Sequence, residues 1–147
     1  MTAKLPVSVL VVVHTAALDV LLLERAARAG LWQSVTGSLD RPDESLAQAA
    51  RREVLEETGI DARAHALERL PLTYRFEIFA RWRNRFAPGV THNTEHAFCL
   101  RLPARCEVAL ARDEHTSHAW LPWREAAARC FSWSNRDAIA MLAERLC

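Results

Sequence analysis

Residues 37–60 read GSLDRPDESLAQAARREVLEETGI, and the architecture of the chain can be worked out from them. Ser45 and Gln48 form a capping box, in which each side chain satisfies a backbone N–H group at the start of a helix. Gly59 can adopt the left-handed conformation that ends many helices. The pattern predicts a helix over about 46–57, roughly 18 Å long at 1.5 Å per residue.

Three carboxylates share one side of this predicted helix. Glu53, Glu56 and Glu57 stand at i, i+3 and i+4, within an arc of about 100°. Like charges so placed repel one another and require compensation. Arg51 and Arg52 on the same helix are one source of it. A hard divalent cation, which binds carboxylate oxygens and keeps several waters, is the other. A charged triplet alone is more often a solvated face, so the helix by itself leaves both alternatives open.

The segments around the helix are typical of strands. Alternation of apolar and polar residues, or a run of β-branched residues, indicates a strand. Within 75–83 the side chains of Phe76, Ile78, Ala80 and Trp82 would share one face. The predicted strands are Pro6–Val13, Val20–Leu23, Arg75–Arg83, Ala97–Leu102 and His118–Leu121, with a hairpin turn at Thr15–Asp19.

A second helix is predicted over Asn135–Leu146, with Ser134 as its N-cap and an apolar stripe of Ile139, Leu142 and Leu146. Strands before and after the first helix, with few helices in all, predict a mixed sheet flanked by helices. The expected fold class is therefore an α/β or α+β sandwich.

Composition narrows the possible functions. The chain has 147 residues, so one domain over 1–147 is expected. With 19 Lys and Arg against 18 Asp and Glu, the net charge of +1 provides no reason to expect nucleic acid or an anionic membrane as partner. The longest uncharged run, Leu5–Leu18, is too short to span a bilayer. The four cysteines lack paired spacing, which favours reduced thiols and a cytoplasmic location. The oligomeric state stays open.

The stretch quoted first resembles the signature of the Nudix hydrolases, Gly-x5-Glu-x7-Arg-Glu-apolar-x-Glu-Glu-x-Gly-apolar. Residues 44–60 match it at every specified position, whereas six residues rather than five separate Gly37 from Glu44. The resemblance identifies a Nudix box at about 37–60. It implies a Nudix-type α/β/α sandwich, hydrolysis of a nucleoside diphosphate linked to another moiety, and Mg²⁺ as cofactor, with Mn²⁺ as a possible substitute.

Pyrophosphate cleavage requires neutralised charge on the phosphoryl oxygens and a water molecule placed in line. The resemblance therefore implies that Glu53 and Glu57 are the primary metal ligands, with Glu56 beside them as ligand or general base. Arg52 is expected to orient the helix through an ion pair with Glu44. Glu114 matches a family glutamate that binds metal near the substrate, so either Glu56 or Glu114 could be the base.

Further segments resemble one branch of the family, the bacterial enzymes that convert dihydroneopterin triphosphate to the monophosphate and pyrophosphate in folate biosynthesis. These segments are 6–12, 31–38, 76–79, 87–91, 93–95 and 132–136. The resemblance implies a small-molecule triphosphate as substrate. Lys4 and Arg25 would contact its phosphates, and Thr36 and Glu114 would lie against it. The implied pterin-binding residues are Phe76, Glu77, Ile78, Phe79 and Ser132.

Other functions remain as alternatives. A general nucleoside triphosphate pyrophosphohydrolase would carry the same box. A Nudix module that only binds nucleotides is disfavoured, because all the box carboxylates are present. Residues 92–96 match H-x-x-E-H, a zinc protease signature that requires a helix, but they lead into a predicted strand. Arg81, Arg83 and Arg85 would share a strand face and either steer the triphosphate or protect an exposed edge.

Overall fold

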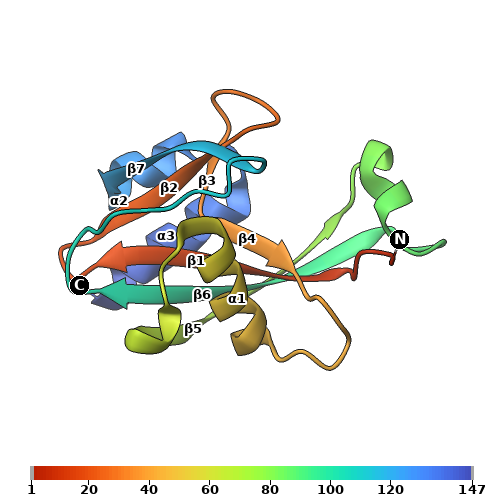
Figure 1. Ribbon diagram of the computed structural model, residues 1–147, viewed down its shortest axis with the longest axis horizontal. Coiled ribbons are helices and arrows are strands. Elements are labelled where there is room, and N and C mark those ends of the chain that lie inside the picture. The colour runs from red at the N-terminus through yellow and green to blue at the C-terminus, as the bar shows by residue number, and fades with distance from the viewer. Residues whose placement is uncertain (1, 147) are drawn as a thin grey trace.

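The computed structural model describes residues 2–146, which form a mixed sheet covered by helices on both faces (Figure 1). Five strands lie in the order β3-β2-β1-β6-β5, while β4 pairs with β1 and β7 pairs with β2. The strands are β1 (Val7–Thr15), β2 (Asp19–Arg25), β3 (Trp32–Gln33), β4 (Val35–Ser38), β5 (Ala66–Glu77), β6 (His92–Leu102) and β7 (His115–Pro122). The helices are α1 (Leu46–Thr58), α2 (Trp123–Arg129) and α3 (Trp133–Leu146), with 3-10 turns η1 (Ala62–Ala64) and η2 (Ala80–Arg85).

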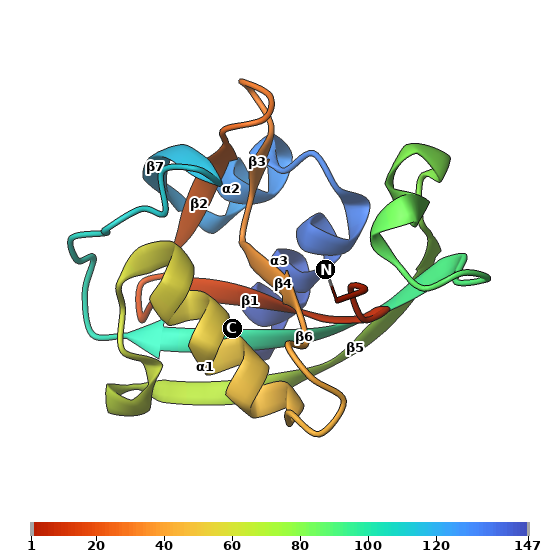
Figure 2. The same cartoon turned by 45° about the vertical axis from the view of Figure 1, so that its right-hand side comes forward.

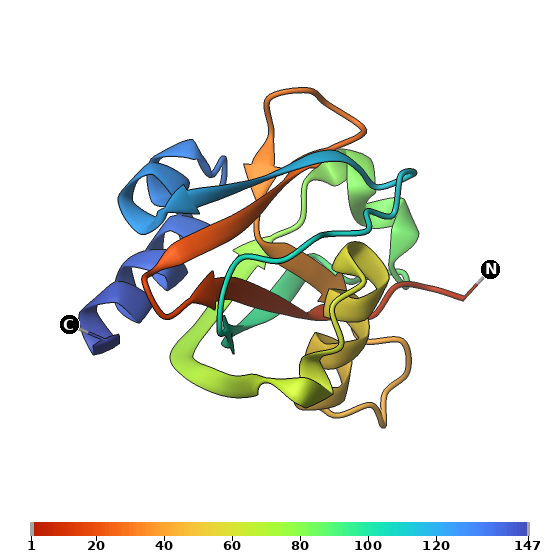
Figure 3. The same ribbon diagram turned by 60° about the vertical axis from the view of Figure 1, so that its left-hand side comes forward.

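The central strand β1 is buried on both faces, which explains its run of valines. Val9, Val11 and Val13 belong to the hydrophobic cluster under α1. Leu10 and Val12 belong to the cluster under α2 and α3. Figure 3 shows α1 on one side of the sheet and the two C-terminal helices on the other. The α/β/α sandwich with a mixed sheet is therefore confirmed.

Strand pairing around β1 sets the positions that matter for function. The N-terminal half of β1 lies between β4, which is antiparallel to it, and β6, which is parallel. Val9 pairs with Gly37 of β4, and Ser8 pairs with both Ser38 and Glu95.

The ends of α1 follow the predicted signals. Ser45 and Gln48 form the capping box, and Gly59 ends the helix with φ of 75°. The Gly59 N–H group donates to the Leu55 carbonyl at 2.9 Å, and the Ile60 N–H group donates to Thr58 Oγ1 at 3.1 Å. The helix thus extends one residue beyond the predicted end.

The predicted N-cap of α3 was wrong by two residues. The helix begins at Trp133, and Ser132 Oγ accepts a hydrogen bond from the Asn135 N–H group at 3.3 Å. Ser134, the predicted N-cap, lies inside the helix and its hydroxyl bonds Glu95, while the Asn135 side-chain amide bonds both the N–H group and the hydroxyl of Ser34. Ile139 and Leu142 are buried as predicted, whereas the side chain of Leu146 lies outside the described part.

The predicted strand Arg75–Arg83 was wrong in its second half. Its partner β6 begins at His92, which pairs with Glu77, so no neighbour continues the ladder. The backbone turns instead into η2, so Ala80 and Trp82 do not extend the face of Phe76. The arginines at 81, 83 and 85 consequently lie on a 3-10 turn and not on one strand face.

The segment 92–96 is part of strand β6, which begins five residues before the predicted start at Ala97. His92 and His96 lie on the opposite face of β6 from Glu95, because side chains alternate along a strand. The arrangement excludes the helical zinc geometry of the H-x-x-E-H signature.

Candidate active site

Helix α1 carries two carboxylates to the edge of β4. Glu57 is 1% exposed, and its Oε2 atom has no hydrogen-bond partner. Glu53 lies directly over Gly37, where an added Cβ atom would come within 2.0 Å of the Glu53 Cδ atom. Glycine is therefore required at position 37, because any side chain there would displace the Glu53 carboxylate.

The start of β7 completes the cluster. One potential ligand atom from each of Glu57, Glu114 and His115 lies within 4.8 Å of the others. His115 Nδ1 is 3.5 Å from Glu57 Oε1, and the Gln33 side-chain nitrogen is 3.3 Å from His115 Nε2. His115 is buried, and sequence reasoning missed it because neither its spacing nor its neighbours form a metal-ligand motif.

The electrostatics of the cluster favour a bound positive charge. Burial, together with the charges of Glu53 and Glu114, raises the pKa of Glu57 to about 10. Burial likewise raises the pKa of Glu53 to about 7, against the opposing influence of Arg52. An orphaned carboxylate oxygen and a set of oxygen donors with one imidazole fit a divalent cation. Residues Glu53, Glu57 and Glu114 could hold it, with His115 beside them.

Arg52 organises the N-terminal side of the cluster. Its Nε and Nη2 atoms donate to the two carboxylate oxygens of Glu44 at 2.9 and 3.0 Å, which confirms the predicted ion pair. The same guanidinium bonds the Ser38 carbonyl at 2.9 Å and Glu53 Oε1 at 2.8 Å. Arg52 also lowers the pKa of Glu44. One buried-facing arginine thus ties α1 to β4 and to the loop before the helix.

Glu56 stands apart from the buried carboxylates. Its side chain is 56% exposed and bonds Arg52 Nη1 at 3.3 Å. The helix places it beside Glu53 but directs it toward solvent, and it is not a member of the group formed by Glu57, Glu114 and His115.

Basic groups border the carboxylates. Burial and the charge of Arg85 lower the pKa of Lys4, whereas the charges of Glu53 and Glu114 raise it. The Lys4 ammonium group is therefore influenced by both the arginine and the carboxylates. The Lys4 N–H group donates to the Arg85 carbonyl at 2.7 Å, which holds the N-terminal segment against η2 (Figure 2). Arg85, expected on a strand face with Arg81 and Arg83, instead ends the 3-10 turn η2.

Aromatic rings extend from this basic region. The Arg25 guanidinium carbon lies 5.8 Å from the centre of the Trp82 ring and 6.0 Å from that of Phe131. Phe79 is 63% exposed and Trp133 is 56% exposed. Trp82, expected on one face of a strand with Phe76, is half-buried on η2, and Phe131 carries no signal in the sequence.

The other predicted substrate contacts differ in accessibility. Phe76 is half-buried on β5, Ile78 is buried, and Glu77 pairs with Arg83. Thr36 lies on β4, where its hydroxyl is 3.4 Å from the Gln33 side-chain nitrogen. Ser132 is half-buried at the start of α3. Of these positions, only Ile78 is buried.

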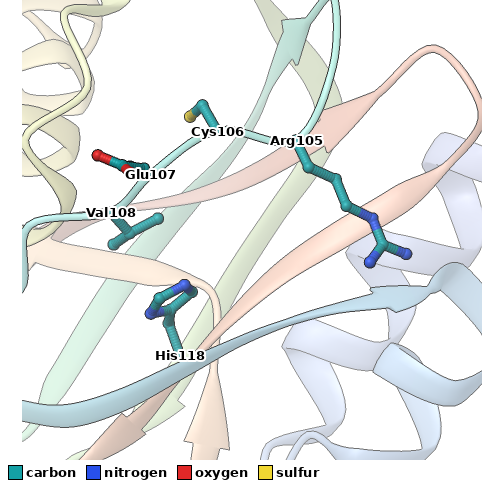
Figure 4. A pocket seen from close by; sticks show the side chains of 5 residues that line it. All are labelled: Arg105, Cys106, Glu107, Val108 and His118. Atoms are coloured by element: carbon teal, nitrogen blue, oxygen red, sulfur yellow. The ribbon is translucent and has the colours of Figure 1, made fainter.

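A separate hollow lies between the β6–β7 connection and β7. It is lined by Arg105, Cys106, Glu107, Val108 and His118 (Figure 4). None of the predicted site residues lines it, and the Cys106 side chain points away from His118 in that view. The carboxylate cluster, rather than this hollow, is therefore the candidate active site.

A buried carboxylate cluster beside a mixed sheet, bordered by basic side chains, defines a class of metal-dependent enzymes that act on phosphoanhydrides. The comparisons with known proteins agree with that class. The NUDIX domain model matches residues 4–142, and the chain belongs to the Nudix family.

Two relatives share most of their length with this chain. It is 47% identical over 139 residues to the dihydroneopterin triphosphate diphosphatase of Escherichia coli (strain K12), covering 92% of this chain and 91% of that one. It is 35% identical over 135 residues to the protein of the same name from Haemophilus influenzae, covering 90% and 84%. The solved structure of the E. coli dihydroneopterin triphosphate pyrophosphohydrolase matches with a TM-score of 0.87 and 44% identity, over 99% of both chains.

Within residues 2–146, no helix is both long enough and apolar enough to cross a bilayer.

Proposed function

We propose that this chain hydrolyses dihydroneopterin triphosphate to dihydroneopterin monophosphate and pyrophosphate. The observation that carries the proposal is the position of Arg25. Burial and, to a lesser extent, the charge of Arg25 lower the pKa of His115 in the carboxylate cluster, and the Arg25 guanidinium also lies close to two aromatic rings. One residue thus joins a site for phosphates to a site for a flat ring. The relatives at 47% and 35% identity carry the name of this activity.

We assign Mg²⁺, or Mn²⁺ in its place, to the carboxylates Glu53, Glu57 and Glu114, with Glu56 as a further ligand or base. The bound cation would neutralise charge on the phosphate oxygens and lower the pKa of water. Arg52, held by Glu44, keeps α1 in the orientation that aims these carboxylates at the β4 edge.

The remaining roles follow from charge and shape. Lys4 and Arg25 bind phosphate oxygens through their positive charges, and the Thr36 hydroxyl donates a hydrogen bond to the substrate. Phe76, Glu77, Ile78 and Phe79 border the pterin, and Ser132 is free to donate its hydroxyl proton because its oxygen already accepts from Asn135.

The reaction consumes one water. Its oxygen bonds to phosphorus, the phosphoanhydride bond between the α- and β-phosphates breaks, and a carboxylate, Glu56 or Glu114, takes the proton. The α-phosphate remains on dihydroneopterin, and the β- and γ-phosphates depart together as pyrophosphate.

The test is a substrate panel with purified protein and Mg²⁺. It compares dihydroneopterin triphosphate with the common nucleoside triphosphates and follows pyrophosphate and orthophosphate separately. The proposal requires preference for the pterin with release of pyrophosphate. Equal or better turnover of nucleotides would instead identify a general nucleoside triphosphate pyrophosphohydrolase, and no turnover of any substrate would identify a binding module.

We also propose a single domain over residues 1–147, since one sheet carries both hydrophobic clusters. A cytoplasmic location and a place in folate biosynthesis belong to the same proposal. Free Cys99, Cys106 and Cys130 support the location, because thiols persist in a reducing compartment, and Cys147 lies outside the described residues.

A further inference from the structure

Buried polar atoms without partners gather at two places in residues 2–145. Glu57 Oε2 and His115 Nδ1 belong to the carboxylate cluster. The others are Glu95 Oε1, Asn93 Oδ1 and Tyr74 OH, on β5 and β6. Buried polar groups in native proteins are nearly always bonded, so a group of unpartnered atoms requires an explanation. The proposed divalent cation would explain the first group. It does not explain the second group.

The second group lies on one patch of the sheet. Glu95 and Asn93 are two residues apart on β6 and therefore share a face. Tyr74 pairs directly with Glu95, and directly paired residues of antiparallel strands project to the same side. This is the face covered by α3, because neighbouring Ala97 and Cys99 pack in the cluster with Ile139.

The hydrogen bonds that Asn93 and Glu95 already make leave an acceptor oxygen free on each side chain. Asn93 donates its amide to Ser8 Oγ at 2.8 Å, so its free atom is the carbonyl oxygen. Glu95 is 7% exposed, and burial raises its pKa against one opposing hydrogen bond from Ser134. A carboxylate so placed is under-compensated, and two N–H donors from a ligand would stabilise its charged form.

The patch adjoins the aromatic part of the candidate site and lies on the other face of the sheet from the α1 carboxylates. Trp133, an exposed aromatic ring, packs edge-on against Tyr74 with ring centres 5.0 Å apart. Glu95 pairs with Ser8, which pairs in turn with Ser38 of β4. Glu95 is therefore two strand spacings, about 10 Å, from the strand that carries Gly37.

We infer that Glu95, with Asn93 and Tyr74, recognises the 2-amino-4-oxo edge of the substrate ring. This edge presents the 2-amino group and the N3–H group as adjacent donors, which one carboxylate can accept together. Guanine has the same pair of donors. Adenine and cytosine present a donor next to an acceptor, and uracil presents one donor between two acceptors. The inference rests on the proposed function and names the residues that would make it selective.

The first experiment uses Glu95→Gln in the full chain, with Glu68→Gln, at an exposed position of β5, as the matched control. We expect Glu95→Gln to lower kcat/KM for dihydroneopterin triphosphate and GTP by about ten- to a hundred-fold, mainly through KM. Turnover of ATP and CTP should change less than about three-fold, because these rings do not present paired donors. Glu68→Gln should leave all four values unchanged.

A second variant covers the case in which Glu95→Gln fails to fold, as judged by thermal unfolding. Tyr74→Phe removes only the unpartnered hydroxyl and keeps the ring against Trp133. It should weaken binding of dihydroneopterin itself, measured by calorimetry without metal, by a few-fold to ten-fold. This readout does not depend on hydrolysis.

The outcomes separate the inference from the proposed function. If the wild type prefers the pterin and the variants keep that preference, the atoms are satisfied by water and the inference is overturned, while the proposed function stands. If the wild type prefers GTP to both pterin and ATP, and Glu95→Gln abolishes that preference, the inference holds and the proposed function fails. A wild type indifferent to the ring overturns both.

Discussion

At Gly37, the lack of a side chain allows Glu53 to reach the carboxylate cluster. The Glu53 carboxylate occupies the volume that a Cβ atom would take, and Arg52 holds it there through Oε1. The backbone of β4 thus shapes the site as directly as the charged residues do. Glycine at position 37 is consequently required for the observed position of Glu53.

We predict that Gly37→Ala will lower turnover by about a hundred-fold or more, the size expected when a catalytic constellation is displaced by an ångström. The added methyl group overlaps Glu53 and forces it away from Glu57. Affinity for Mn²⁺, measured by calorimetry, should fall in parallel. Ser38→Ala is the control, because it removes atoms from the next residue of β4 and adds none. Unchanged Mn²⁺ affinity in Gly37→Ala would contradict the close approach.

Glu57→Gln should lose at least roughly a hundred-fold in turnover, because it removes a charge expected to hold the cation. The amide preserves volume, so packing against His115 is retained. Steady-state assays with saturating Mg²⁺ measure the effect. Near-normal turnover in this variant would show that the metal site is elsewhere.

At the scale of the element, α1 is held at both ends by its own sequence. The capping box satisfies its first turn, and Gly59 closes its last turn in a left-handed conformation. Arg52 then anchors the helix laterally to Glu44 and the Ser38 carbonyl. These local devices keep Glu53 and Glu57 in place against their mutual repulsion.

The end of α1 can be tested with two glycine variants. Gly59→Ala should destabilise the protein by about 1–2 kcal/mol from left-handed strain, plus a contribution from the Cβ atom of Ala109, 3.0 Å from the added methyl. Gly30→Ala is the matched control, because Gly30 has a similar φ of 85° and open space around it. Urea unfolding should show the larger loss for Gly59→Ala. Equal losses would mean that the Ala109 contact relaxes without cost.

At the scale of the whole molecule, the site opposes folding when no cation is bound. Glu57, with a pKa of about 10 in the fold, keeps its proton where the unfolded chain, with an ordinary glutamate pKa of 4.5, has lost it. Between these values the folded protein binds more protons than the unfolded chain. The free energy of unfolding therefore falls as pH rises across this window. Glu53 makes the free energy of unfolding fall further between pH 4.5 and about 7, for the same reason.

We therefore predict that Glu57→Gln stabilises the protein at pH 8 in the presence of a chelator, by at least about 1 kcal/mol, and has little effect near pH 5. Urea unfolding at several pH values measures the difference. Added Mg²⁺ should reverse the order, because the cation binds the folded wild type and raises its free energy of unfolding. Parallel curves of wild type and variant against pH would refute the raised pKa of Glu57.

The sequence by itself determined α1, its two ends and its carboxylates, because helical spacing and capping are local properties of the chain. The Glu44–Arg52 pair was expected from the resemblance to the Nudix family. The sequence also determined the strands whose apolar pattern persists, such as β1 and the C-terminal half of β6. Only the tertiary structure decided which residues from distant segments meet. His115 reaches Glu57 through the pairing of β7 with β2, and Glu95 becomes buried through the docking of α3. The strand predicted at 75–83 ends at Glu77 for the same reason, since a strand continues only where a neighbour supplies hydrogen bonds.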